Sequence, residues 1–203
     1  MFYYEDLKFQ TCPKVYAPAE DTFLLADNLI LSEGEVVLEI GTGTGLIALT
    51  ASKKASQVIA TDINHHAVKC ARANMELNDI NNIKFHLGNL FQPVQNEKFD
   101  LILFNTPYLP SSKDEIVGDE LDAAWDGGAD GRRVIDLFLN EVKYYLNDGG
   151  RVQLVQSSLS DNEKTLERLE KMNFDVEITD SERFFFEEIV VITGFYSKVN
   201  EQS

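Results

Sequence analysis

The stretch Val36-Val37-Leu38-Glu39-Ile40-Gly41-Thr42-Gly43-Thr44-Gly45 decides the fold of this chain. Its apolar first half predicts a buried strand, and a helix is expected from Leu46 to Lys54. Glycines between a strand and a helix let a ligand approach the backbone, and the helix N-terminus favours negative charge. The spacing is E-x-G-x-G-x-G rather than the G-x-G-x-x-G of dinucleotide-binding proteins, because Leu46 fills the third glycine position. A tight turn without a ligand is the alternative interpretation of the glycines alone.

Beyond this stretch, short apolar runs alternate with segments of helical period through the 203 residues. The alternation predicts an α/β fold, a Rossmann-like, doubly wound and mostly parallel seven-stranded sheet with an antiparallel edge strand. No helical segment separates the last two strands, so we expect them to pair antiparallel at one edge. The other strands are expected at 58–61, 83–87, 99–104, 151–156, 175–179 and 188–195, and the other helices at 18–31, 64–78, 134–146 and 161–172.

No linker, repeat or low-complexity tract divides the chain. We therefore expect a single domain over 1–203, with an N-terminal segment and helix in 1–32 and the core in 33–203. Hydrophobic residues make up 44% of the sequence and charged residues 26%, which is typical of a globular domain. The first residues show no basic stretch followed by an apolar one, and no apolar run is long enough to cross a membrane. These features predict a cytoplasmic protein with no membrane segment.

The charge of the chain is strongly acidic, with 34 acidic against 18 basic residues and a net charge of −16. A groove that follows nucleic-acid phosphates needs a basic surface, so the composition argues against a nucleic-acid partner. Cys12 and Cys70 are the two cysteines, and neither has C-x-x-C or C-x-x-H spacing. We therefore expect neither a disulfide framework nor a metal site, and interpret both as small buried or half-buried apolar residues.

Asp62 and Asn89 stand at the carboxyl ends of the second and third predicted strands. A carboxylate at the end of the second strand can accept hydrogen bonds from both hydroxyls of a ribose. The amide of Asn89 has the donor and acceptor needed to contact the edge of an adenine. Together with the glycine turn, these residues favour a nucleoside-containing ligand over a purely structural turn.

Asn105-Thr106-Pro107-Tyr108 follows the apolar run of the fourth predicted strand. The amide of Asn105 can accept and donate hydrogen bonds, Pro107 restricts the backbone, and Tyr108 offers a flat face for stacking. Such a group suits a planar, polar nitrogen compound held at the mouth of the sheet. The long segment from Asn105 to Gly131 is expected to be functional or mobile.

These motifs resemble those of class I methyltransferases that use S-adenosylmethionine, and more narrowly those of the HemK-like family, which methylates the glutamine of release-factor GGQ motifs. Residues 15–25, VYAPAEDTFLL, are similar to the start of the family's archaeal and eukaryotic branch. Asn105-Thr106-Pro107-Tyr108 is similar to the N-P-P-Y signature. Residues 123–128, AAWDGG, followed by Gly131-Arg132, resemble the loop after that signature. The resemblance covers most of the chain.

The resemblance implies a role for each matching residue. Asp62 would hold the ribose of S-adenosylmethionine, Asn89 and Leu90 would flank its adenine, and Thr22 would lie near its methionine end. The full set implied for the cofactor is Thr22, Glu39, Gly41, Gly43, Gly45, Asp62, Ile63, Asn89, Leu90 and Asn105. The implied catalytic residues are Asn105, which accepts a hydrogen bond from the amide nitrogen, Thr106, whose backbone carbonyl is a second acceptor, Pro107, and Tyr108, which packs on the amide plane.

Two residues depart from the family pattern. Asn89 stands where an acidic residue is common, so the adenine contacts are expected to be weaker or rearranged. Thr106 replaces the first proline of the signature. Threonine keeps the backbone carbonyl but loses some rigidity, so we expect the same chemistry from a slightly looser loop.

Three functions are compatible with the sequence. The first is an S-adenosylmethionine-dependent protein glutamine N5-methyltransferase that acts on a class 1 release factor. The second keeps the cofactor but methylates an exocyclic amine of adenine or another base in DNA or RNA, since similar motifs hold flipped bases. The third is a non-catalytic partner protein that only binds S-adenosylmethionine. The charge argues against the second function, and the intact Asn-x-Pro-Tyr argues against the third.

The resemblance also implies a small zinc-binding activator that covers an apolar edge of the sheet and forms a heterodimer. Val58-Ile59 and the segment near Ile83 are the candidate edge positions. Phe184-Phe185-Phe186 is interpreted mainly as core or edge packing, with a platform for a substrate as the alternative. Trp125 is interpreted as an anchor of its loop or a contact for a protein substrate. The acidic residues Asp114, Glu115, Asp119, Glu120 and Asp122 are expected to form a solvated loop or a docking surface for a basic substrate domain.

Overall fold

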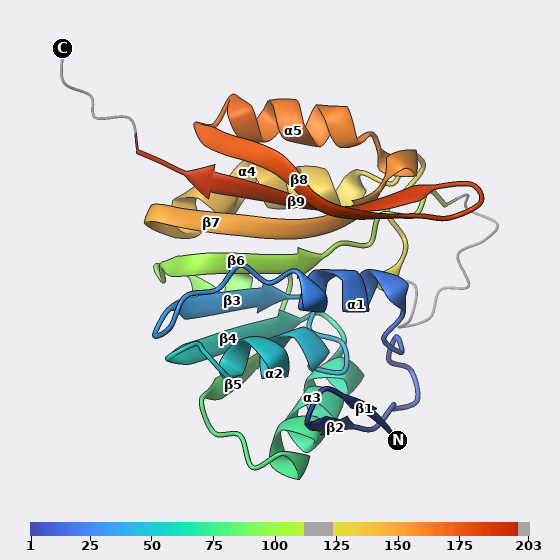
Figure 1. The fold of residues 1–203 in the computed structure, drawn as a ribbon, viewed down its shortest axis with the longest axis vertical. Helices are drawn as coiled ribbons and strands as arrows, with labels where there is room; N and C mark the ends of the chain where they lie inside the picture. Colours follow the sequence, from blue (N-terminus) through green and yellow to red (C-terminus); the bar gives the residue numbers. More distant parts are fainter. Residues whose placement is uncertain (112–123, 199–203) are drawn as a thin grey trace.

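The computed structural model describes residues 1–111 and 124–198 and contains a seven-stranded sheet in the order β5-β4-β3-β6-β7-β9-β8 (Figure 1). The predicted α/β fold with a doubly wound, mostly parallel sheet is therefore confirmed. Within the described residues, no helix is long and apolar enough to cross a membrane. The strands of this sheet are β3 (Val36–Ile40), β4 (Gln57–Asp62), β5 (Ile83–Leu87), β6 (Phe99–Asn105), β7 (Leu146–Ser157), β8 (Phe174–Arg183) and β9 (Glu188–Tyr196).

In the described parts of the chain, five α-helices accompany the strands: α1 (Glu20–Asp27), α2 (Leu46–Ser52), α3 (His65–Leu77), α4 (Arg133–Glu141) and α5 (Asn162–Glu170). In Figure 1, α1 and α2 lie in front of the sheet and α4 lies behind it. Because both faces are covered, the interior strand β3 is buried almost throughout, which explains why it is apolar except for Glu39. The helix expected at 134–146 changes into a short 3-10 turn (Val142–Tyr145) after α4, and the helix expected at 18–31 is shorter.

The last two strands pair antiparallel at one edge, as predicted. β9 runs opposite to the rest of the sheet and lies between β7 and β8, so β8 forms the edge. β5 forms the other edge. The expectation that Val58-Ile59 lies at an edge is wrong, because β4 lies between β3 and β5 and both side chains are buried. The other candidate position, the segment near Ile83, does lie on an edge strand, β5.

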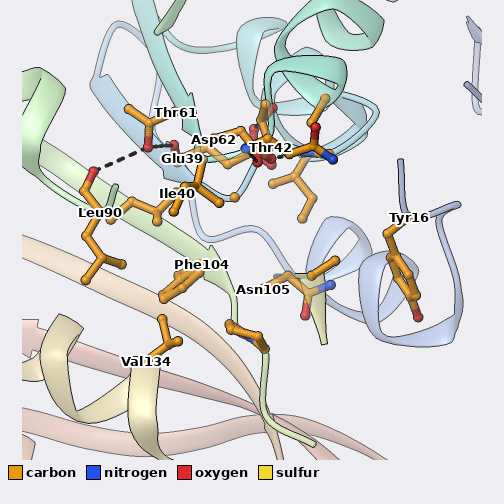
Figure 2. A pocket seen from close by; sticks show the side chains of 18 of the residues that line it. Tyr16, Glu39, Ile40, Thr42, Thr61, Asp62, Leu90, Phe104, Asn105 and Val134 are labelled. Carbon is orange, nitrogen blue, oxygen red and sulfur yellow. Dashed lines mark hydrogen bonds between the residues drawn. The ribbon is translucent and has the colours of Figure 1, made fainter. Parts of the chain in front are cut away.

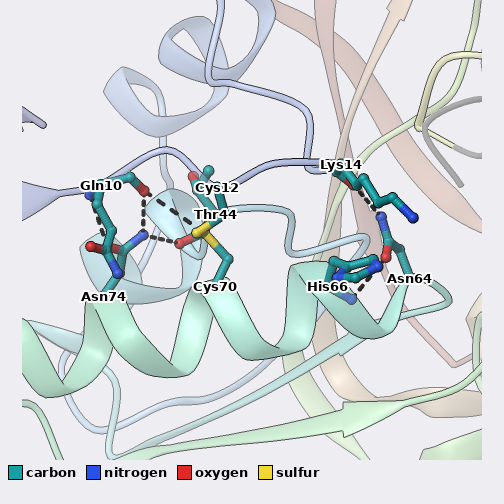
Figure 3. Close-up of a disulfide and its surroundings, with 8 residues drawn as sticks. All are labelled: Gln10, Cys12, Lys14, Thr44, Asn64, His66, Cys70 and Asn74. Carbon is teal, nitrogen blue, oxygen red and sulfur yellow. Dashed lines mark hydrogen bonds between the residues drawn. A yellow bond between two sulfur atoms is a disulfide. The ribbon is translucent and has the colours of Figure 1, made fainter.

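An N-terminal hairpin, β1 (Phe2–Tyr4) and β2 (Leu7–Phe9), was not predicted from the sequence. Strand β2 and the segment after it run along α3 and are held there by side-chain amides, of which Figure 3 shows those of Asn74 and Asn64. Asn78 exchanges two hydrogen bonds with the backbone of Lys8, both 2.8 Å long. Asn74 accepts from the amide of Gln10 at 2.9 Å and donates to its carbonyl at 3.1 Å. Asn64 donates to the carbonyl of Lys14 at 2.7 Å.

Cys12 and Cys70 form a disulfide, so the expectation of two unpaired cysteines is wrong (Figure 3). The two residues are 58 positions apart in sequence, yet their Cα atoms lie 6.0 Å apart. Because the N-terminal segment returns along α3, it brings Cys12 against the middle of that helix. This tertiary path leaves no spacing motif in the sequence, which is why the pairing was missed.

Candidate active site

A cavity of about 320 Å³ opens at the carboxyl ends of the parallel strands. Its volume lies within the range of small-molecule sites. From β3 the chain continues to β4 and β5 on one side and then returns to β6 on the other side of β3, so the cavity is at the switch point of the sheet, where α/β proteins bind ligands. Figure 2 shows the polar residues of β3 and β4 facing Asn105 across it. The sequence-predicted residues that line it are Thr22, Glu39, Gly41, Gly43, Asp62, Ile63, Asn89, Leu90, Asn105 and Pro107.

Three predicted residues do not line this cavity: Gly45, Thr106 and Tyr108. Gly45 is the residue before α2 and has a φ of +85°. A β-carbon on it would lie 3.0 Å from the β-carbon of Ala71, so this glycine allows α2 and α3 to pack closely. Gly43 differs, because its φ is +56° and a β-carbon there would meet nothing within 4 Å. Its backbone is therefore open to a ligand.

Glu39 is fully buried at the end of β3. One carboxylate oxygen, Oε2, accepts a 2.6 Å hydrogen bond from the hydroxyl of Thr42. The other, Oε1, is buried without a hydrogen-bond partner in the part of the chain that the structure describes. Burial raises the pKa of Glu39 to about 8. A positively charged ligand in the cavity would stabilise the ionised carboxylate, so this orphaned oxygen is suited to a cationic group.

Asp62 is held by two backbone amides. Its Oδ2 accepts from the amide of Gly43 at 2.9 Å, and its Oδ1 accepts from the amide of Asn64 at 2.8 Å. Burial raises the pKa of the Asp62 carboxyl, although these hydrogen bonds act in the opposite direction. Each carboxylate oxygen has a second lone pair. The two oxygens are therefore fixed in place and able to accept from a pair of vicinal hydroxyls.

The far end of the cavity has a largely apolar wall. Leu90, Phe104, Val134 and Leu137 line it, and Asn89 supplies an amide beside them. The carbonyl of Leu90 accepts a long, 3.5 Å hydrogen bond from the hydroxyl of Thr61, which fixes the turn after β5 (Figure 2). A slot with apolar walls and one amide suits a flat heterocycle. Val134 and Leu137 come from the start of α4, a helix that the sequence placed correctly without linking it to the site.

Asn105 lies at the end of β6, and its side-chain amide is oriented by α1. Its Nδ2 donates to Oδ2 of Asp21 at 3.1 Å and lies 3.4 Å from the hydroxyl of Thr22. Because a carboxylate only accepts, the nitrogen must face Asp21, and Oδ1 must face the other way. Oδ1 is buried and has no hydrogen-bond partner among the described residues, 1–111 and 124–198. A buried, unpaired acceptor costs free energy unless a ligand donates to it, so the site is prepared for an N–H group.

Tyr108 shares the same carboxylate. Its hydroxyl donates to Oδ2 of Asp21 at 3.3 Å. Burial, reinforced by the charge of Asp21, raises the pKa of Tyr108, so the phenol stays protonated and remains a donor. Asp21 thus connects Asn105 and Tyr108 through one oxygen. The sequence alone assigns no role to Asp21, because a carboxylate near the start of a helix is also an ordinary structural feature.

Thr106 fixes the loop rather than loosening it. Its hydroxyl donates to the carbonyl of Val155 on β7 at 2.7 Å, and its amide donates to the same oxygen at 3.3 Å. A proline at this position would lack both donors. The expected loss of rigidity is therefore offset by two hydrogen bonds to the neighbouring strand.

The residues after 123 return to the Asn105–Tyr108 segment. The amide of Leu109 donates to the carbonyl of Trp125 at 3.2 Å, and the amide of Gly127 donates to the carbonyl of Leu109 at 2.9 Å. Gly131 packs so closely that a β-carbon on it would overlap the carbonyl oxygen of Tyr108. Trp125, expected to anchor its loop or contact a substrate, is half-buried in this return. The predicted acidic run at 114–122 lies outside the described residues.

Comparison with known proteins gives a consistent result. The sequence pattern of the methyltransferase small domain family matches residues 6–123. A relative from Methanocaldococcus jannaschii, provisionally named a protein N5-glutamine methyltransferase, is 46% identical over 94% of this chain and 96% of its own length. Methyltransferase HEMK2 of Homo sapiens is 36% identical over 75% of this chain and 76% of its own.

A solved structure shares the fold over nearly all of the chain. It is the Mtq2–Trm112 complex of E. cuniculi, described as responsible for methylation of the eRF1 translation termination factor. The TM-score is 0.71 with 26% identity, and the match covers 91% of this chain and 99% of that one. The predicted class I methyltransferase fold is confirmed by this match and by the observed sheet.

Proposed function

Because this chain belongs to the HemK-like branch of the methyltransferase small domain family, we propose that it methylates the side-chain amide nitrogen of a glutamine in the GGQ motif of a class 1 release factor. The observation that carries this proposal is the unpaired Oδ1 of Asn105, held beside the cofactor-sized cavity by Asp21. An acceptor fixed in this way matches the N–H of a primary amide. We also propose a cytoplasmic location, because release factors act in translation.

The residues that line the cavity fit S-adenosylmethionine as the methyl donor. When bound, this cofactor supplies a methyl group on a positively charged sulfur. Glu39 has the unpaired carboxylate oxygen that a cation requires, and Gly43 leaves its backbone open. Asp62 would accept from the ribose hydroxyls, and the slot formed by Leu90 and its neighbours would hold the adenine beside Asn89. Thr22 and Ile63 complete the lining, whereas Gly41 and Gly45 shape the loop and its helix.

The chain activates the acceptor mainly by positioning it. An amide nitrogen is a weak nucleophile because its lone pair is delocalised into the carbonyl. Oδ1 of Asn105 would accept one amide hydrogen and the backbone carbonyl of Thr106 the other. Tyr108 would pack on the amide plane, and Pro107 would limit the movement of the loop. Holding the nitrogen in one orientation supplies most of the acceleration, because the reacting atoms no longer have to find each other.

The competing function is methylation of an exocyclic base amine, since such an amine also presents two N–H groups. The deciding assay offers two substrates side by side, an intact release factor with its GGQ motif and single-stranded DNA or RNA, with labelled S-adenosylmethionine. We expect label on the factor alone, mapped by mass spectrometry to the glutamine. Label on nucleic acid, or none on either substrate, contradicts the proposal. The second result would favour a non-catalytic protein that only binds the cofactor.

A small partner protein is also proposed, because the similar Mtq2 structure is a complex with Trm112. β5 is the edge strand on the side of the sheet where β3 and β4 line the cavity, so a partner could pair with it there. Leu87 at the end of β5 is exposed. We propose that a zinc-binding partner pairs with this edge to form a heterodimer. The assay above is therefore run with the chain alone and after coexpression with such a partner. Equal activity and equal solution mass in both preparations would exclude the heterodimer.

Asp21→Asn should lower the rate of methyl transfer about 10- to 100-fold, the range expected for losing a hydrogen bond to a charged group. An asparagine at this position can donate as well as accept, so the amide of Asn105 is no longer held with Oδ1 free. Cofactor affinity should change by less than about threefold, because Asp21 does not line the cavity. Glu20→Gln, in the same turn of α1 but exposed, is the matched control. Steady-state kinetics and calorimetry of cofactor binding give both quantities, and an unchanged rate for Asp21→Asn would show that it does not position Asn105.

A further inference from the structure

The tip of the β8–β9 hairpin exposes two large aromatic side chains. Phe185 is 93% exposed and Phe186 is 85% exposed, and their rings meet edge to face with centroids 4.8 Å apart. The interpretation of 184–186 as packing residues holds only for Phe184, which is half-buried against the core. For the two residues after it, that interpretation is wrong. An exposed pair of phenylalanines is unfavourable in water and marks a possible interaction surface.

The hairpin holds this pair in a defined position. β8 and β9 are paired along their length, up to Arg183 opposite Glu188. The amide of Phe184 donates to the carbonyl of Glu187 at 2.8 Å and closes the tip. The amide of Glu188 donates to the hydroxyl of Ser158 at 3.0 Å, which ties the tip to the end of β7. A partner would therefore meet a preformed surface and lose little conformational freedom in ordering it.

The tip lies at the same end of the strands as the Asn105 site, the end where the parallel strands have their carboxyl termini. In Figure 1 the hairpin projects beyond the carboxyl ends of β3 and β6. Glu188 is bonded to the turn Ser158–Ser160, and this turn lies close to the backbone of Tyr108. Gly131 is packed between them, since a β-carbon on it would meet both Ser160 and the carbonyl of Tyr108. The carboxylate of Glu187 also acts electrostatically on Tyr108. A macromolecule that presents a side chain to Asn105 must therefore pass close to the phenylalanine pair.

Acidic residues surround this pair. Asp180, Glu182, Glu187 and Glu188 lie on the same hairpin, against one cation, Arg183. The whole chain carries a charge of −16, so the field around the tip is negative. The complementary surface is an apolar pocket with basic residues around it. Resting on the proposed function, we propose that Phe185 and Phe186 dock the protein substrate, the release-factor domain that carries the glutamine, through such a pocket.

The test compares the Phe185→Ser/Phe186→Ser double variant with the unaltered protein, in the preparation that is active in the substrate assay. Both side chains are exposed, so the variant should fold, which circular dichroism and cofactor binding would verify. We expect the KM and the Kd for the intact release factor to rise at least tenfold, with kcat nearly unchanged. Tyr144→Ser removes another exposed aromatic side chain, which is 61% exposed. Tyr144 lies just before β7 and therefore at the opposite end of the strands, far from the hairpin tip. This substitution should leave both constants unchanged.

The outcomes separate this proposal from the proposed function. Unchanged KM and Kd in the double variant overturn the docking site while leaving the methyltransferase assignment intact. If the unaltered protein binds the factor without methylating it, the assignment fails and the Kd comparison still decides the docking site. If it neither binds nor methylates the factor, both proposals are overturned. Phe185→Ser and Phe186→Ser, measured singly, show which ring contributes more.

Discussion

Asn105→Ala should lower the rate of methyl transfer by about 100- to 1,000-fold, the loss seen when a preorganised hydrogen-bonding group is removed from an active site. In the structure, Oδ1 of Asn105 is buried and unpaired, and Asp21 holds the amide with this oxygen free. Alanine removes the acceptor without adding a charge or a larger side chain. Single-turnover kinetics with labelled S-adenosylmethionine and the release factor measure the change directly.

Cofactor affinity should fall only severalfold in the same variant, since Asn105 is one of many residues that line the cavity. Asn105→Gln is the matched comparison, because it keeps the amide but moves the acceptor by one methylene. We expect it to be nearly as inactive as Asn105→Ala, since positioning rather than polarity supplies the rate. Retention of most activity in either variant would remove Asn105 from the catalytic residues.

Cys70→Ser should lower the free energy of unfolding by about 4 kcal/mol, the stabilisation expected for a disulfide that closes a loop of this length. The bond joins Cys12 to the middle of α3 across 58 positions. It holds the segment that includes Val15 and Tyr16, which line the cofactor cavity. The variant should therefore also bind the cofactor less tightly, because the unbonded segment covers the cavity for a smaller fraction of the time.

Denaturant unfolding with and without a reducing agent tests this effect. Reduction should lower the midpoint of the unaltered protein to that of Cys70→Ser and should leave the variant itself unchanged. Cys12→Ser is the matched control, since it removes the other half of the same bond and should give the same midpoint. A reduced protein as stable as the oxidised one would contradict a stabilising disulfide between these residues.

The core of the fold was predictable because each of its elements carries a local pattern. The strand at Val36–Ile40 is apolar except for Glu39 and buried on both faces, and the glycines after it mark a turn in any context. The polar residues at the strand ends could also be assigned to one site, because parallel strands bring their carboxyl ends together. Asp62 and Asn89 indeed line one cavity with Asn105.

What could not be predicted depends on contacts between distant segments. Asp21 orients Asn105 from 84 positions away, and nothing near either residue signals the other. Cys12 and Cys70 pair only because the N-terminal hairpin directs the chain along α3. Phenylalanine is typical of a protein core, but Phe185 and Phe186 are exposed because the hairpin extends past the body of the sheet.

Asn74 in α3 and Asn78, the C-cap of this helix, give the helix a property usually found in a strand. A side-chain amide carries the same donor and acceptor as a peptide group, so Asn78 and Asn74 bond to Lys8 and Gln10 as residues of an adjacent strand would. The spacings also agree, since four helical residues rise about 6 Å and two extended residues span about 6.6 Å. Because the two spacings match, both asparagines can bind at once, and they bond to main-chain atoms of Lys8 and Gln10. These hydrogen bonds therefore do not use the side chains at positions 8 and 10, whereas they require the side-chain amides of both asparagines.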